Sequence, residues 1–104
     1  MQKILKKIDS FLLSLGLKLK ENKMQNSYYD KYGAVVMVKI RYNKIVLSFA
    51  RGNKLANKFP KLKGNAKIVR YLEFNNIDDI NKKELKEMIK ESYILGIEAY
   101  ERKF

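Results

Sequence analysis

Hydrophobic residues at the start of the chain recur at steps of three and four, which is the spacing of one face of an α-helix. The residues on this face are Ile4, Leu5, Ile8, Phe11, Leu12 and Leu15. Gly16 follows them as a suitable C-terminal stop, so we predict a helix over residues 2–15. The alternation over 17–20 is typical of a short strand, whereas 21–32 is polar and rich in tyrosine. Because 21–32 has no clean period, we predict a loop there, with or without a helical turn.

The middle of the chain changes to a period of two, which indicates β-strands. Residues 34–42 are dominated by β-branched side chains, and one face contains Val36, Val38, Ile40 and Tyr42. Asn43 tolerates a positive φ and predicts a tight hairpin. Residues 45–50 then return antiparallel, with one face made of Ile45, Leu47 and Phe49. We predict a third strand over 67–74.

The rest of the chain contains a long connection and a second helix. We expect three apolar residues of the connection 52–66 to pin it to the body: Leu55, Phe59 and Leu62. Asn81 is a good N-cap, and Glu84 three residues later forms a capping-box pattern at the start of a helix over 82–102. The order of elements predicts one α+β domain over 1–104. Its antiparallel sheet has three strands, or four with 17–20, and the N- and C-terminal helices pack on one face.

Two amino acids are absent, and each absence removes a class of chemistry. The 104 residues include no Cys, which excludes disulfides, zinc–thiolate sites, iron–sulfur ligation and a thiol nucleophile. They include no His, the commonest general base and metal ligand. The serines therefore lack a histidine partner, and the chain has no phosphate-binding glycine loop. We expect no enzyme, no catalytic residue and no cofactor.

The start of the chain and its hydropathy bear on location. Met1 opens a Lys-containing amphipathic stretch rather than a signal peptide. No apolar run approaches the roughly 18 residues of a membrane span. We expect a cytoplasmic protein that does not bind a membrane.

Charge is distributed unevenly along the chain, whose formal net charge is +12. Residues 1–72 contain 17 basic and 3 acidic side chains, whereas 73–104 contain 6 basic and 8 acidic ones. No acid occurs between Lys31 and Leu72. Codon drift in an AT-rich genome would enrich lysine, but it does not by itself remove acids from such a long stretch. The basic part is either a solvated surface or a surface that meets an anion.

Basic and aromatic residues alternate closely in several places, as in Arg41-Tyr42 and Arg70-Tyr71. Aromatic faces stack on bases while amines and guanidiniums bind phosphates, so this composition suits single-stranded DNA or RNA. The candidate aromatic surface is Tyr28, Tyr29 and Tyr71, and the candidate anion-binding residues are Arg51, Lys54, Lys63, Lys67 and Arg70. An acidic protein surface is the other class of partner, and tyrosines that merely pack on the sheet would give the same pattern.

Two of the four arginines fall on the apolar side of predicted strands. Arg70 shares the period-two face of Ile68, Leu72 and Phe74, and Arg51 continues the face of Phe49 one step past the strand end. A buried guanidinium must find acceptors. In a structural role, Arg70 bonds loop carbonyls around 52–66 or acids of the last helix, and Arg51 closes the strand end. In a functional role, Arg51, Arg70 and Lys67 form an oxyanion pocket.

A metal site would have to be built from carboxylates alone. Glu84, Glu87 and Glu91 share one face of the last predicted helix, and oxygen ligands suit hard cations and iron. Interleaved lysines make the same residues typical of a solvated helix face.

Several motifs in the second half of the chain resemble one family. They are Leu-Ser-Phe-Ala-Arg-Gly at 47–52, Leu55, Leu-Lys-Gly-Asn-Ala-Lys at 62–67, Arg70-Tyr71 and Ile-Asp-Asp-Ile at 77–80. Over roughly 34–95 this pattern resembles the YdhG-like family of small bacterial domains of unknown function, sometimes described as frataxin-like. The resemblance implies an α+β fold and, as an alternative function, iron binding and delivery. Ala66 stands where the family usually has a second glycine, and Tyr71 where many members have histidine.

Overall fold

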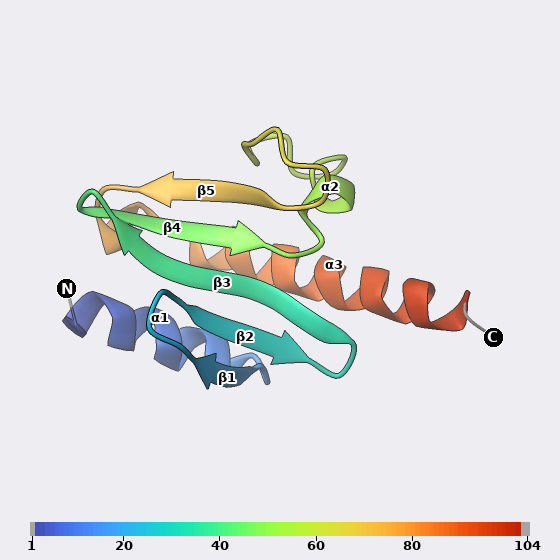
Figure 1. The fold of residues 1–104 in the computed structure, drawn as a ribbon, viewed down its shortest axis with the longest axis horizontal. Coiled ribbons are helices and arrows are strands. Elements are labelled where there is room, and N and C mark those ends of the chain that lie inside the picture. The colour runs from blue at the N-terminus through green and yellow to red at the C-terminus, as the bar shows by residue number, and fades with distance from the viewer. Residues whose placement is uncertain (1, 103–104) are drawn as a thin grey trace.

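The computed structural model describes residues 2–102, and its centre is one five-stranded antiparallel sheet (Figure 1). Each strand pairs with its neighbours in the sequence, in the order β1-β2-β3-β4-β5. The strands are β1 (Lys18–Glu21), β2 (Asn26–Asp30), β3 (Gly33–Arg41), β4 (Lys44–Phe49) and β5 (Arg70–Phe74).

Two long helices, α1 (Gln2–Ser14) and α3 (Lys82–Glu101), cover one face of this sheet, and Figure 1 looks onto the other face. The short elements are α2 (Gly52–Leu55) and η1 (Ile77–Asp79). Asn81 caps α3 as predicted, because its side chain accepts a hydrogen bond from the Glu84 N–H at 3.0 Å. The predicted α+β fold with both terminal helices on one face is confirmed. None of the helices within 2–102 combines the length and apolarity needed to cross a membrane.

The period-two pattern correctly identified the core face of the central strands. Ile45, Leu47 and Phe49 of β4 are at most 2% exposed, and they pair with Ile40, Val38 and Val36 of β3. A β-bulge between Tyr28 and Tyr29 places one extra β3 residue, Val35, opposite β2. Val35 and Val36 are both fully buried, which simple alternation does not allow. At the hairpin, Tyr42 (φ 50°) and Asn43 (φ 61°) both adopt the left-handed conformation that suits a tight two-residue turn.

Three details of the predicted elements were wrong. Residues 26–30, predicted as loop, form β2, because β1 and β3 supply hydrogen-bonding partners on both of its sides. The third predicted strand starts at Arg70 rather than at 67, and Ile68 is 53% exposed. Tyr42 does not share the core face of β3, because it lies in the turn and is 85% exposed.

The connection between β4 and β5 packs back onto the body, as predicted. Leu55 is fully buried, Leu62 is 8% exposed and Phe59 packs against the core. Gly52 is buried at the start of α2, where a Cβ would lie 2.3 Å from the backbone nitrogen of Arg70. Only glycine permits this close approach of α2 to β5.

Candidate functional site: a basic sheet face

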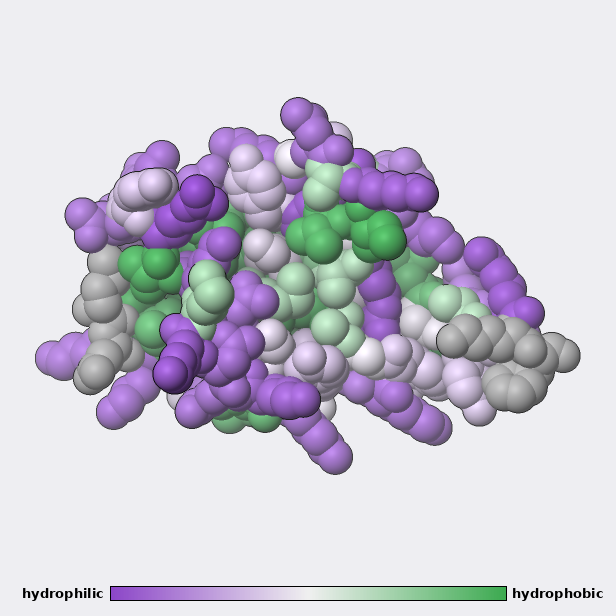
Figure 2. All heavy atoms as spheres, in the orientation of Figure 1, coloured by the Kyte–Doolittle hydropathy of each residue, from purple (hydrophilic) through white to green (hydrophobic). Residues whose placement is uncertain are grey.

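The side of the sheet that faces away from α1 and α3, here called the open face, is rich in cations and poor in acids. Strand alternation and pairing place on it Lys20, Ser27, Met37, Lys39, Arg41, Lys44, Val46, Ser48, Tyr71 and Glu73. Glu73 is the only acid among them. Figure 2 looks at this face and shows a pale centre of weakly polar and weakly hydrophobic residues, with green hydrophobic patches above it and toward the left, and hydrophilic residues around the rim.

One row of directly paired residues crosses the open face from edge to edge. Its members, in order, are Lys20, Ser27, Met37, Ser48, Tyr71 and Lys63. Lys63 joins the row because its backbone exchanges two hydrogen bonds of 2.9 Å with Tyr71. The row therefore has an amine at each end and uncharged side chains between them.

A shallow hollow of about 390 Å³ lies beside this row, over β3, β4 and β5. Lys39, Arg41 and Lys44 line it together with Glu73, so cations outnumber acids. The Arg41 guanidinium lies over the Tyr42 ring, 5.4 Å from its centroid. An exposed aromatic ring beside a guanidinium offers a stacking surface and a phosphate ligand at one place.

The three predicted tyrosines occupy different environments. Tyr28 is 1% exposed and its hydroxyl donates to Asp9 Oδ1 of α1 at 2.7 Å, so its assignment to an aromatic surface was wrong. Burial and the neighbouring Asp9 raise the pKa of the Tyr28 phenol well above its ordinary value. Tyr29 is half-buried and pairs directly with Lys18, two positions from the Ser27–Lys20 pair, so strand alternation places it at the β1 edge of the open face; it also lines a cleft beside α3. Tyr71 lies on the open face, where the turn at Gly64 covers part of its ring.

The predicted anion-binding residues separate into two groups. Lys54, Lys63 and Lys67 are exposed and form no ion pair within residues 2–102. Asn53 donates its N–H to Ile68 O at 2.7 Å, which brings the neighbouring Lys54 and Lys67 to the same end of the connection. The arginines, by contrast, both bind acceptors inside the protein.

Arg70 holds the end of the connection. One of its terminal nitrogens donates to the carbonyls of Ala66 and Val69, the second at 3.0 Å. Ala66 is the last residue of the predicted connection 52–66 and Val69 follows three residues later, so the contacts match the structural role rather than the pocket.

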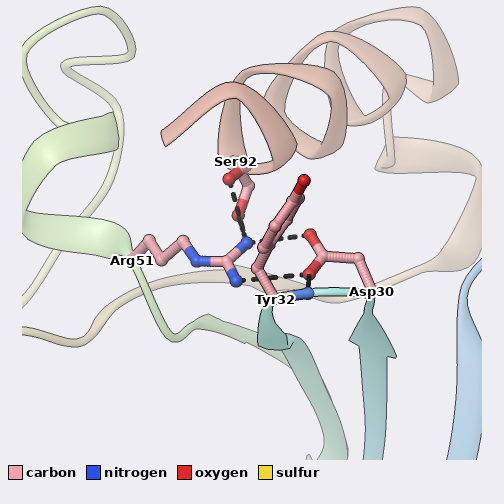
Figure 3. Close-up of polar contacts among 4 residues, drawn as sticks. All are labelled: Asp30, Tyr32, Arg51 and Ser92. Carbon is pink, nitrogen blue, oxygen red and sulfur yellow. Dashed lines mark hydrogen bonds and ion pairs between the residues drawn. The ribbon is translucent and has the colours of Figure 1, made fainter. Parts of the chain in front are cut away.

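Arg51 lies beneath the sheet and binds a carboxylate (Figure 3). Its guanidinium contacts both oxygens of Asp30, at 2.9 and 3.2 Å, and donates to Ser92 O of α3 at 2.9 Å. The side chains of Arg51 and Asp30 are only 17% and 7% exposed. A two-pronged contact of this kind suits arginine and not lysine. Because the charge of Arg51 is neutralised by Asp30, the geometry does not favour the predicted oxyanion pocket with Arg70 and Lys67.

Gly96 of α3 makes room for this arrangement. A Cβ at position 96 would lie 3.1 Å from the Arg51 guanidinium carbon and 3.0 Å from Tyr32 Cβ. The glycine in the middle of α3 therefore permits close packing of the guanidinium against the helix.

The acids proposed as metal ligands bind lysines instead. Glu91 pairs with Lys58 at 3.3 Å and Glu84 pairs with Lys61 at 3.5 Å, while Glu87 is exposed. Within residues 2–102, no group of three or more acids could hold a metal ion. The part of the chain that the structure describes thus offers no specific support for the iron alternative.

Of the cations on the open face, Lys63 was among the predicted anion-binding residues, whereas Lys20, Lys39, Arg41 and Lys44 were not, although a signal for some of them existed. In the predicted strand 34–42, the residues between the apolar ones are Met37, Lys39 and Arg41. This second face of the alternation indicates a basic surface once the first face is assigned to the core. The position of Lys20 and Lys63 in the same row depends on strand pairing, so it could not be predicted from the alternation within one strand.

Comparison of the chain with models of known protein families, with curated proteins and with solved structures gives no match. The resemblance to the YdhG-like family therefore stays a prediction.

Proposed function

We propose that this protein is a non-enzymatic binding module whose open face binds single-stranded nucleic acid without sequence specificity. The observation that carries the proposal is the row from Lys20 to Lys63, with the cations Lys39, Arg41 and Lys44 beside it. Amines and guanidiniums at these positions bind phosphates, and the exposed Tyr42 ring provides a face for a base. Paired strands are about 4.8 Å apart, so the row spans about 24 Å, enough for roughly four nucleotides.

Single-stranded nucleic acid fits this face better than a duplex does. The face presents no helix that could enter a major groove within the described residues, and both helices lie behind the sheet. The pale centre of weakly polar and weakly hydrophobic residues suits bases that lie flat, whereas a duplex exposes mainly phosphates.

Fluorescence anisotropy with a labelled twelve-nucleotide oligouridine tests this proposal. We expect binding at 50 mM salt that weakens as salt rises, by about 0.7 log units per log unit of salt for each phosphate contact. Removing two cations with Lys39→Gln and Arg41→Gln should lower the slope of log affinity against log salt concentration by about 1.4. The matched control is Lys3→Gln with Lys7→Gln, which removes the same charge from exposed positions of α1.

A third variant tests stacking. Tyr42→Asn removes the ring, and asparagine tolerates the positive φ at this position. This variant should bind the oligonucleotide about fivefold more weakly, or weaker still. Three results would contradict the proposal. They are no binding at 50 mM salt, binding that does not depend on salt, and an equal loss of oligonucleotide affinity in the open-face and α1 variants. Capture of an acidic protein in place of the oligonucleotide would contradict it as well.

A further inference from the structure

A separate cleft of about 630 Å³ lies where the end of α1 and the start of β1 meet α3. Its lining includes Leu17 and Ile89, which are each 6% exposed, together with Tyr29 and Tyr93. Tyr93 is held in place by Tyr32, whose ring centroid lies 5.5 Å away. The cleft therefore has an apolar floor, and its volume lies within the range of about 300–1,000 Å³ that is usual for small-molecule sites.

Lysines surround this apolar floor. Lys18, Lys31, Lys86 and Lys90 all line the cleft, all four are exposed, and none forms an ion pair within residues 2–102. The only acid in the lining is Asp30. Its carboxylate already binds the Arg51 guanidinium at 2.9 Å and the Tyr32 N–H at 2.8 Å, so it does not neutralise the lysines.

One of these lysines, Lys86, has only like charges at the helix spacings that bring charged side chains together. Lys86 and Lys90 are four residues apart, and Lys82 and Lys83 precede Lys86 by four and three residues. Like charges at these spacings repel each other on a helix. Glu87 precedes Lys90 by three residues, which is a favourable spacing, so an anion in the cleft would relieve mainly the repulsion at Lys86.

We propose that this cleft binds a small organic carboxylate with an apolar body, of the alkyl or aryl acid type. The apolar body lies against Leu17, Ile89 and Tyr93, and the carboxylate lies among the lysine amines. Burial of the body supplies affinity, and the lysines select an anionic head over a neutral or cationic one. The two proposals are tested separately, because Lys86 and Lys90 belong to α3, which lies behind the sheet, whereas Lys39 and Arg41 lie on the open face.

Three probes with the same ten-carbon chain test the choice of head group: decanoate, decanol and decyltrimethylammonium. Backbone amide shifts in ¹H–¹⁵N spectra of the full chain would be followed below the micelle-forming concentrations of the two charged probes and below the solubility limit of decanol. We expect decanoate to shift Gly16, Leu17 and Ile89 and to bind about tenfold more tightly than decanol, and the ammonium probe to bind least. Weak binding of decanoate, or equal binding of decanol, would overturn the proposal.

Charge variants test the position of the carboxylate. Lys86→Gln with Lys90→Gln should weaken decanoate binding about tenfold and leave decanol binding unchanged. The matched control, Lys82→Gln with Lys83→Gln, removes the same charge from the same helix outside the cleft and should change decanoate binding less than about twofold. An equal loss of decanoate affinity in the two variants would overturn the proposal, because it would mean that only the overall charge matters. Binding to anionic or zwitterionic vesicles without binding to monomeric decanoate would also overturn the proposal, because it would identify a membrane surface instead.

Discussion

Replacing Asp30 with alanine removes the carboxylate that holds the Arg51 guanidinium beneath the sheet. The two side chains are 7% and 17% exposed, so this ion pair is close to the buried limit. Removing one partner of a buried pair lowers the free energy of unfolding by about 3–5 kcal/mol, whereas exposed pairs contribute about 0–1 kcal/mol. Arg51 keeps Ser92 O as an acceptor at 2.9 Å, which places the expected loss near the lower figure, at about 3 kcal/mol.

Equilibrium urea unfolding followed by circular dichroism measures this loss directly. For a chain of this size, about 3 kcal/mol corresponds to a fall in Tm of roughly 12–24 °C. The control is Glu91→Ala, which breaks the pair with Lys58, whose side chains are 24% and 68% exposed. In this control, the free energy of unfolding should fall by about 1 kcal/mol or less.

A double variant separates the unpaired charge from the lost contacts. Asp30→Ala with Arg51→Met leaves no buried cation and should be more stable than Asp30→Ala alone. The reasoning fails if Asp30→Ala loses no more than the Glu91 control, or if the double variant is less stable than the single one. Either result would mean that the Arg51–Asp30 pair is solvated in solution.

Three further predictions concern stability. Tyr28→Phe should lower the free energy of unfolding by about 1 kcal/mol below pH 10, since it removes the hydrogen bond to Asp9. In the wild type, folding raises the pKa of Tyr28 above the ordinary 10.0, so the stabilising contribution is complete below pH 10 and is lost as pH rises through the folded value. The difference between wild type and Tyr28→Phe in urea unfolding should shrink accordingly, and a difference that grows with pH would contradict this. Gly52→Ala should lower the free energy of unfolding in urea by at least about 2 kcal/mol, because the new Cβ would lie 2.3 Å from the backbone nitrogen of Arg70. An unchanged unfolding midpoint would contradict the close approach of α2 to β5. Arg70→Lys should lower Tm, because the guanidinium donates hydrogen bonds to the loop carbonyls of Ala66 and Val69. Added phosphate should not restore the Tm of this variant. Restoration by phosphate would instead favour an anion pocket.

The sequence by itself determined the elements whose pattern is local. The amphipathic spacing predicted α1, the cap at Asn81 predicted the start of α3, and the alternation of Ile45, Leu47 and Phe49 predicted the buried face of β4. Each of these signals needs only neighbouring residues, because a helix turn and a strand pleat repeat within a few positions. Together they were enough for the α+β class.

Tertiary structure alone decided which side chains meet across the fold. Arg51 binds Asp30 and Ser92, which lie 21 and 41 positions away, and Tyr28 reaches Asp9 at a separation of 19. β2 lacks a strand-like pattern of its own and forms because β1 and β3 pair with both of its edges. The same pairing assembles the row from Lys20 to Lys63. Such contacts depend on how distant segments pair and pack, which local periodicity does not encode, so the candidate surfaces appear only in the folded chain.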